Sequence, residues 1–244
     1  MTKFIERMII RTQAFLILLF LYSCTNHKSQ VKEDPIHFVD PLIGTDYHGH
    51  TYPGATVPFG MVQLSPDTRT VGWDACAGYH YSDSSILGFS HTHLSGTGIG
   101  DYGDILMIPF TGETQIVSGT PEDPDSGYRS RFSRESEHAT PGYYKVFLDD
   151  YNVQVELTAT ERAGFHQYVF PKAQDAGIII DLNHTIHEHF NHINEIRIIN
   201  EYEIEGLKKT HGWADNHYCY FKAKFSKPFE VELYQDDKLL TNKE

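Results

Sequence analysis

Short strand-like segments separated by turn residues constrain the fold of this 244-residue chain more than any other feature. From Pro35 onward, apolar and polar residues alternate repeatedly, most clearly at Val153, Val155 and Leu157, which share one face of a strand. No long apolar stripe with a helical period of 3.6 residues occurs there. The pattern predicts an all-β fold, a large antiparallel sandwich without strand–helix–strand units. Strands are predicted at residues 57–64, 105–110, 143–148, 152–158, 165–170, 178–182, 196–198, 202–204, 217–225 and 229–233.

The N-terminus is typical of an export signal. Basic residues precede an unbroken apolar run at 14–21, which is too short to span a bilayer and ends in Leu21-Tyr22-Ser23-Cys24. This resembles a bacterial lipoprotein signal, with a signal peptide at 1–23, lipidation of the Cys24 thiol and a polar tether at 24–35. The protein is then expected on a membrane of the bacterial cell envelope, periplasmic or at the cell surface. The alternative is an ordinary signal peptide with a chance cysteine.

Composition narrows the class of partner. A net charge of −13 with 20 basic residues disfavours binding to a nucleic-acid backbone. The 15 tyrosines and 15 phenylalanines suit a neutral polar ligand such as a sugar, although these residues also favour β-strands. In an oxidising compartment, Cys76 and Cys219 either form one disulfide or remain as two buried thiols.

A glycine-rich loop at residues 90–104 combines four glycines in eight residues with two histidines and two aspartates. Glycines allow backbone turns with positive φ and a close approach to another surface. His91 and His93, two residues apart, would share one face of a strand and could ligate a metal such as zinc. The alternative is a structural turn whose histidines hydrogen-bond to the backbone.

Two other polar segments are candidates for chemistry. In Gly72-Trp73-Asp74, the indole could stack on a sugar ring and the carboxylate could accept hydrogen bonds from hydroxyls, unless Trp73 simply packs in the core. The segment from His184 to His192 holds four histidines in nine residues. It could bind a transition metal, but we expect a polar exposed loop.

Several stretches together resemble the N-terminal domain of glycoside hydrolase family 92, the calcium-dependent exo-α-mannosidases of bacteria. They occur in family order at residues 39–44, 53–67, 90–104, 141–144, 157–166 and 225–229. The resemblance implies a β-supersandwich over residues 36–244, like the galactose-mutarotase-like carbohydrate-binding folds. In the family an (α/α)₆ toroid follows, and the two domains enclose the site. Hydrolysis proceeds with inversion, using one carboxylic acid and one carboxylate base, while Ca²⁺ binds sugar hydroxyls.

The resemblance also implies which residues could act. It places the catalytic acid, the catalytic base and the calcium ligands in the toroid, which the sequence does not include, so no catalytic residue and no complete calcium site are assigned. Trp73 and Asp74 are the first candidates for substrate contact. His91, His93 and Asp101 are weaker candidates, which could instead hold the domain interface.

The sequence thus predicts the substrate-site domain of an inverting α-mannosidase that acts on α-mannosides of glycans, a fragment inactive by itself. Two alternatives remain open. One is a stand-alone carbohydrate-binding lipoprotein of the envelope. The other is an envelope protein that binds metal through its histidine-rich segment.

Overall fold

The computed structural model describes residues 34–172, 175–187, 189–235 and 238–240. The predicted signal peptide, Cys24 and most of the tether lie outside these residues. Met1–His37 and Phe38–Glu244 are two separate compact units, and the second is described below. The first described element is a 3₁₀ turn, η1 (Pro35–Phe38). Among the described residues, no helix is long and apolar enough to cross a bilayer.

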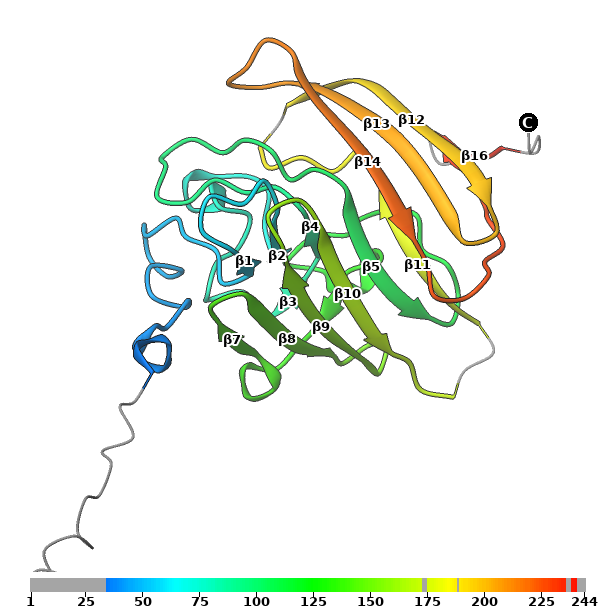
Figure 1. Ribbon diagram of the computed structural model, residues 1–244. Coiled ribbons are helices and arrows are strands. Elements are labelled where there is room, and N and C mark those ends of the chain that lie inside the picture. Colours follow the sequence, from blue (N-terminus) through cyan, green and yellow to red (C-terminus); the bar gives the residue numbers. More distant parts are fainter. Residues whose placement is uncertain (1–33, 173–174, 188, 236–237, 241–244) are drawn as a thin grey trace, which may run out of the picture. The chain divides into compact units, whose positions relative to one another are not determined.

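Two antiparallel sheets form the body of this domain (Figure 1). The first has five strands in the order β1-β2-β4-β5-β11, and the second has four in the order β10-β9-β8-β7. The strands of the first sheet are β1 (Ala55–Thr56), β2 (Gln63–Asp67), β4 (Gly88–Ser90), β5 (Leu106–Thr111) and β11 (Ala176–Asp181). Those of the second are β7 (His138–Thr140), β8 (Tyr143–Leu148), β9 (Val153–Ala159) and β10 (Gly164–Val169).

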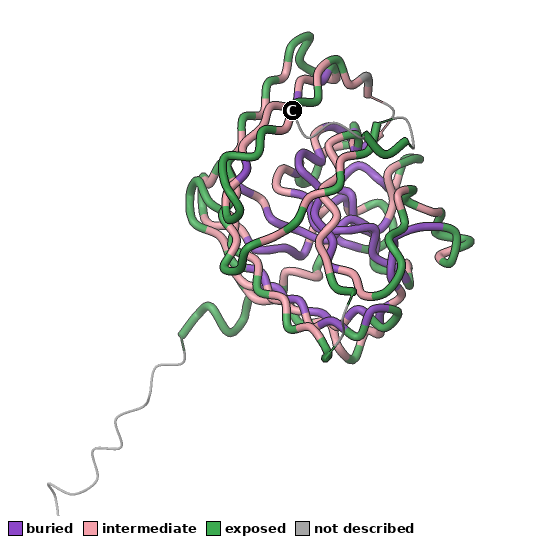
Figure 2. The backbone as a smooth tube through the Cα atoms, turned by 90° about the vertical axis from the view of Figure 1, so that its right-hand side faces the viewer, coloured by how far each residue is buried: buried purple, intermediate pink, exposed green. Residues whose placement is uncertain are grey.

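The core lies between these two sheets. Val153, Val155 and Leu157 are buried while the residues between them are partly exposed, which confirms the predicted alternation in β9. They pack in one cluster with buried residues of the first sheet, among them Leu64 and Ile108. Burial of these apolar side chains is the main driving force for the sandwich. Figure 2 shows the buried segments gathered inside the domain, beneath exposed loops.

A third antiparallel sheet has the order β12-β13-β14. It consists of β12 (Phe190–Asn200), β13 (Glu203–His211) and β14 (His217–Lys224). In β14 every second residue from His217 to Ala223 is partly buried, as the alternation in the sequence predicts. On β13, Lys208 and Thr210 are buried on the face that these residues share. This inner face is therefore partly polar, unlike the apolar core of the sandwich.

The remaining elements are short. Two two-stranded ribbons pair β3 (Ser85–Ile86) with β6 (Ser130–Arg131), and β15 (Tyr234–Gln235) with β16 (Lys238–Leu239). Three further 3₁₀ turns are η2 (Trp73–Ala75), η3 (Pro124–Ser126) and η4 (Arg134–Ser136). The predicted all-β antiparallel fold is confirmed.

The strand predicted over residues 57–64 is mostly wrong. The Val57 carbonyl accepts a 2.9 Å hydrogen bond from the Gly60 amide, so the chain turns here. Phe59, at the tip, is fully exposed with φ +60°, and β2 begins only at Gln63. An apolar run is therefore a turn where Pro and Gly punctuate it.

The strand predicted over residues 229–233 is also wrong. These residues follow Pro228 and form no ladder. The Phe229 amide bonds to the Glu201 carbonyl at 3.0 Å, and strand pairing resumes only at β15. Alternation alone cannot supply the missing partner strand.

Candidate functional site

A buried carboxylate, Asp67 at the end of β2, organises the polar interior beside the glycine loop. Its two oxygens lie 2.7 Å from Nε2 of His93 and 2.8 Å from Nε2 of His184. Burial opposes ionisation of Asp67, but the charges and hydrogen bonds of the two histidines hold its pKa well below the usual range. Gly78, at φ +76°, is required here, since a Cβ would lie 2.1 Å from Asp67 Oδ1.

His93 is held on both sides of its ring. Nδ1 donates a 2.7 Å hydrogen bond to the Gln63 carbonyl, and Nε2 faces Asp67 and the Ser90 hydroxyl. The His93 side chain has no exposed surface. The structure therefore does not place it where a ligand could touch it directly.

His91 belongs to a different chain of hydrogen bonds. The Tyr168 hydroxyl lies 2.7 Å from His166 Nδ1, His166 Nε2 lies 3.0 Å from His91 Nε2, and His91 Nδ1 bonds to the Ile105 carbonyl at 2.7 Å. One direction satisfies every group: the hydroxyl donates to His166, His166 donates to His91, and His91 donates to the carbonyl. Burial lowers the pKa of both histidines, which agrees with two neutral rings. His91 and His93 thus have separate partners and do not converge on a shared metal.

The far end of the glycine loop holds the third sheet. Asp104 is buried and forms an ion pair with Lys208 of β13, with Nζ 3.3 Å from Oδ1. Its other oxygen accepts hydrogen bonds from Thr92 and from His217 Nε2 at 2.7 and 2.8 Å. Burial of Asp104 opposes ionisation, but the His217 hydrogen bond and the Lys208 charge lower its pKa to about 2.

Asp101 secures the turn between β13 and β14. Its carboxylate accepts a 2.9 Å hydrogen bond from the Trp213 amide and another from the Tyr102 amide. A Cβ on Gly212 would lie 2.4 Å from the same carboxylate, so the turn approaches it closely. Asp101 is only 4% exposed. In this structure it connects the glycine loop to the third sheet.

The histidine-rich segment is not the exposed loop that the sequence suggested. His184 and Ile186 are buried, and the Ile186 amide bonds to the Tyr102 carbonyl at 3.0 Å. His189 Nε2 donates to the Gly100 carbonyl at 2.9 Å. The segment is therefore packed against the glycine loop, because the two polar stretches satisfy each other's hydrogen bonds.

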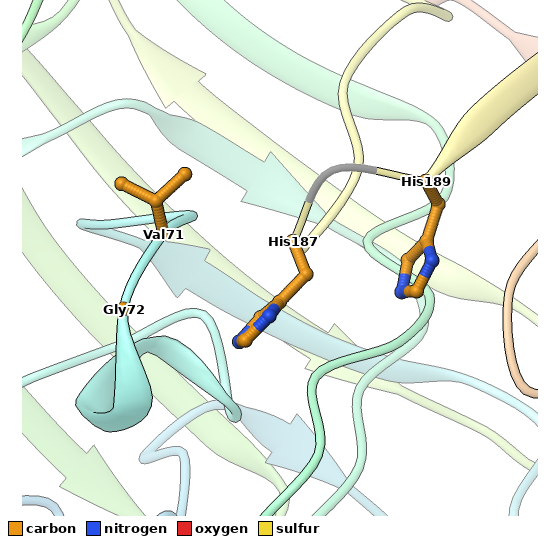
Figure 3. Close-up of a pocket in the computed structure, with 4 residues that line it drawn as sticks. All are labelled: Val71, Gly72, His187 and His189. Carbon is orange, nitrogen blue, oxygen red and sulfur yellow. The ribbon is translucent and has the colours of Figure 1, made fainter.

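A shallow pocket of about 340 Å³ opens beside this segment (Figure 3). It is lined by Val71 and Gly72 on one side and by His187 and His189 on the other. Nearby, Cys76 Sγ lies 4.0 Å from His187 Nε2. Cys76 is a free thiol, as is Cys219, so the two form no disulfide.

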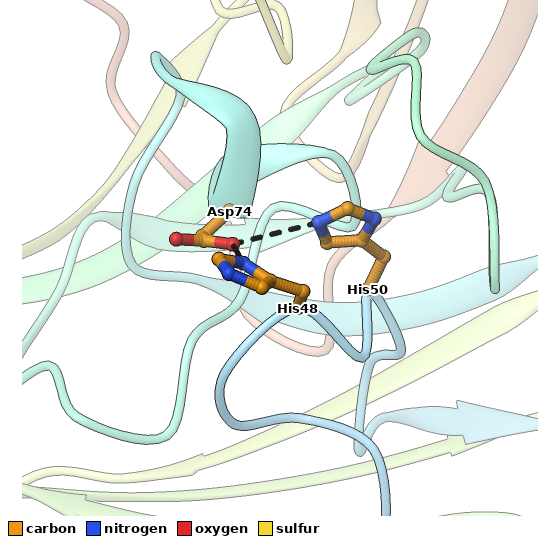
Figure 4. Close-up of side chains that lie close together, drawn as sticks. All are labelled: His48, His50 and Asp74. Atoms are coloured by element: carbon orange, nitrogen blue, oxygen red, sulfur yellow. Dashed lines mark hydrogen bonds and ion pairs between the residues drawn. The ribbon is translucent and has the colours of Figure 1, made fainter.

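Trp73 and Asp74 lie on the surface turn η2. Trp73 is 58% exposed, so it is not a core residue, and its ring meets the His50 ring edge-on at 4.9 Å. Asp74 Oδ1 lies 2.6 Å from His48 Nδ1 and 3.6 Å from His50 Nε2 (Figure 4). The hydrogen bond with His48 lowers the pKa of Asp74.

Among the described residues, His48, His50 and Asp74 are the group of side chains with metal-ligand spacing. Two imidazoles and one carboxylate do not match Ca²⁺, which takes about six to eight oxygen ligands. The calcium ion implied by the family resemblance therefore does not fit this group.

Sequence reasoning missed Asp67, Lys208 and His166 as organisers of the interior. The strand alternation could have identified Lys208. It lies an even number of residues from Ile204 and Thr210 on β13, so its charged side chain shares their buried face. No local pattern pointed to the pairing of His166 with His91, since 75 residues separate them.

Comparison with known proteins extends over most of the chain. The sequence model of the glycosyl hydrolase family 92 N-terminal domain matches residues 38–244. A GH92 α-mannosidase from Bacteroides thetaiotaomicron, solved with mannoimidazole, is 44% identical with a TM-score of 0.83, covering 87% of this chain. A GH92 inverting mannosidase of the same organism is 28% identical with a TM-score of 0.68, also over 87% of this chain.

A curated relative from Arthroderma benhamiae, described as an uncharacterized secreted glycosidase, is 32% identical over 169 residues, 63% of this chain. This chain spans 20% of that relative and 28% of each of the two solved mannosidases. The matching region is the β-rich domain described above. The chain therefore belongs to glycosyl hydrolase family 92, through its N-terminal domain.

Proposed function

We propose that this domain forms the sugar-contacting wall of an α-mannosidase site that acts on α-mannosides of glycans. The observation that carries the proposal is the exposed Trp73 ring beside the Asp74 carboxylate, in a domain 44% identical to that of a GH92 α-mannosidase. An aromatic face packs on the apolar face of a sugar ring, and a carboxylate accepts hydrogen bonds from its hydroxyls.

The local structure supports this role for Trp73. A Cβ on Gly98 would lie 2.6 Å from the indole, so the glycine loop approaches the ring closely, and the His50 ring meets it edge-on. These contacts restrict the indole while more than half of its surface stays open to solvent. An aromatic side chain fixed in this way loses little conformational entropy when a ligand binds.

His91, His93 and Asp101 are proposed to shape this wall from behind. Each is bonded to the interior or to the third sheet, as described above. They would affect a sugar ligand through the position of the glycine loop that carries Gly98. Their contribution would therefore be to orientation and stability rather than to direct contact.

Inverting hydrolysis requires an acid and a base about 6.5–9.5 Å apart across the sugar. The buried Asp67 and Asp104 are committed to histidine and lysine partners. We therefore propose that the proton-transfer carboxylates and the Ca²⁺ ligands belong to the part of the family's length that this chain does not cover. By itself, the 244-residue chain would bind α-mannosides without cleaving them.

The test measures hydrolysis of an aryl α-mannoside by the purified chain, with Ca²⁺ and with a chelator, beside a complete family member as positive control. No release of the aryl group is expected in either condition. Calorimetry with mannobiose should detect binding. Ca²⁺-dependent turnover by this chain would refute the assignment of the catalytic groups elsewhere, and an absence of binding heat would refute the sugar-contacting wall.

A second candidate is a carbohydrate-binding envelope protein that acts alone. One observation argues against this candidate. Phe59 and Met61 are large apolar residues on a surface loop, 106% and 62% exposed, as expected for a face that a further domain covers. Replacing both with serine should improve the solubility of this chain if a domain normally covers them. Unchanged high solubility of both forms would instead favour the stand-alone binder.

We also propose lipid attachment at Cys24, which the N-terminal sequence alone supports. Metabolic labelling with palmitate in a bacterial host should label the wild-type chain and not Cys24→Ala, with Cys76→Ala as the matched control. Equal labelling of the wild-type and Cys24→Ala chains would exclude this anchor.

A further inference from the structure

We propose that His48, His50 and Asp74 form a binding site for a divalent transition-metal ion such as Zn²⁺. One potential ligand atom of each residue lies within 4.8 Å of the others. The three side chains converge from two segments, the loop around His48 and His50 and the turn η2 that carries Asp74 (Figure 4).

The strongest sign of a missing partner is His50. Its side chain is 6% exposed, and its Nε2 makes no hydrogen bond within the described part of the chain. This nitrogen faces Asp74 Oδ1 at 3.6 Å, which is too far for a hydrogen bond. A buried imidazole nitrogen without a hydrogen bond is costly, and a metal ion would satisfy it.

One of the measured separations already suits a small tetrahedral ion. Ligands about 2.0–2.1 Å from zinc lie roughly 3.3–3.4 Å from one another in a tetrahedron. The separation of His50 Nε2 from Asp74 Oδ1, 3.6 Å, is close to this value. The 2.6 Å contact between His48 and Asp74 would have to open by about 0.7 Å. His48, with a side chain 67% exposed, is free to make this movement.

The loop that carries the two histidines is fixed by its backbone. A Cβ on Gly49 would lie 1.9 Å from the Gly44 carbonyl oxygen, so only glycine fits between the two histidines. The Thr51 amide bonds to that same carbonyl at 3.2 Å, and the His50 carbonyl accepts a 2.7 Å bond from Gly96. The buried ligand is thus held in place before any ion binds, which favours affinity.

The ligand types select the ion. Two imidazole nitrogens and one carboxylate oxygen match zinc and similar ions, whose sites with three protein ligands leave a position for water. Ca²⁺ and Mg²⁺ prefer oxygen ligands and are expected to bind weakly here. The inference does not depend on the proposed sugar contact, although a bound ion would connect the His48 loop to the turn that carries Trp73.

The experiment titrates the chelator-treated, dialysed 244-residue chain with Zn²⁺ in a calorimeter, and with Co²⁺ to read its absorption bands. The wild type is expected to bind one Zn²⁺ ion. The Zn²⁺ affinity should fall at least tenfold in His50→Ala, since removal of even an outer-shell partner costs about 10–100-fold in affinity. His138→Ala, an exposed histidine outside the group, is the matched control and should bind as the wild type does. Zn²⁺ should also raise the unfolding temperature of the wild type but not of His50→Ala.

His48→Ala changes an exposed side chain and keeps the test valid if His50→Ala fails to fold. Tetrahedral Co²⁺ bands that disappear in His48→Ala or Asp74→Asn would support the site. Zn²⁺ affinity unchanged in all three variants would overturn it. If only His189→Ala loses Zn²⁺ binding, the ion binds at the histidine-rich segment instead. That result would also overturn the proposal.

Discussion

Lys208 and Asp104 form an ion pair in which neither side chain has any exposed surface. The pair joins the third sheet to the end of the glycine loop. Lys208 also donates hydrogen bonds to the carbonyls of Gly103 and His184. One ammonium group therefore connects β13, the glycine loop and the histidine-rich segment.

Lys208→Met should destabilise the domain strongly. The substitution keeps most of the side-chain volume but leaves the Asp104 carboxylate buried without its ammonium partner, at a cost of about 3–5 kcal/mol. Urea unfolding measures the loss. Lys224→Met, which removes an exposed partner of Glu203, should cost at most about 1 kcal/mol. Equal small losses in both variants would contradict a structural role for the buried pair.

The stability of the domain should fall on acidification because of His91 and His166. Burial holds the pKa of both rings below the usual value of about 6.5, so the folded protein excludes protons that the unfolded chain binds. This contribution is present above about pH 6.5 and is lost as the pH falls toward the depressed values, by up to about 1.4 kcal/mol per pH unit for each proton.

Chemical denaturation between pH 7.5 and 5.0 checks this loss in the wild type. His166→Gln, which cannot titrate, should show a flatter dependence on pH, whereas His138→Gln, at an exposed position, should follow the wild type. An equal pH dependence in the wild type and in His166→Gln would show that this ring is not held neutral.

Trp73→Ala should weaken α-mannoside binding at least about tenfold, the scale of a central aromatic contact. It should leave the unfolding free energy nearly unchanged, because the indole is mostly exposed. Trp213→Ala is the matched control, since this residue is 68% exposed at the β13–β14 turn. Calorimetric titration measures the α-mannoside affinity of both variants. Equal affinities would mean that the sugar does not contact Trp73.

The Cys219 thiol should resist alkylation. Burial raises its pKa to about 12, so the reactive thiolate is scarce at pH 8. Iodoacetamide labelling followed by peptide mass spectrometry should show modification at least about a hundredfold slower in the folded chain than in urea. Rapid labelling of the folded chain would mean that β14 opens readily.

Much of the sandwich could be predicted because its strands carry their pattern locally. Val153, Val155 and Leu157 are buried on one face of β9, as the alternation requires. The failures at residues 57–64 and 229–233 have one origin: apolar residues form a strand only where a neighbouring strand supplies hydrogen bonds. Sequence alone does not reveal that neighbour.

The interior polar network could be predicted far less well. Its contacts join residues distant in sequence, such as Asp67 with His184, 117 positions apart. The composition of the glycine loop does not reveal that its histidines and aspartates bond within the domain. The exposure of Trp73 shows that it is not a core residue. The contacts of Trp73 and Asp74 with a sugar stay predictions, as does the indirect effect of His91, His93 and Asp101 on a sugar ligand.

The two aspartates of the glycine loop have a consequence for how this domain can vary. Asp101 holds the amide of Trp213, and Asp104 holds Lys208 and His217, so the loop and the hairpin from 203 to 224 share their polar contacts. A chimera that takes one segment from a relative with other residues at these positions would leave buried charges unmatched. The loop and the hairpin are therefore a single module, to be transplanted together or not at all.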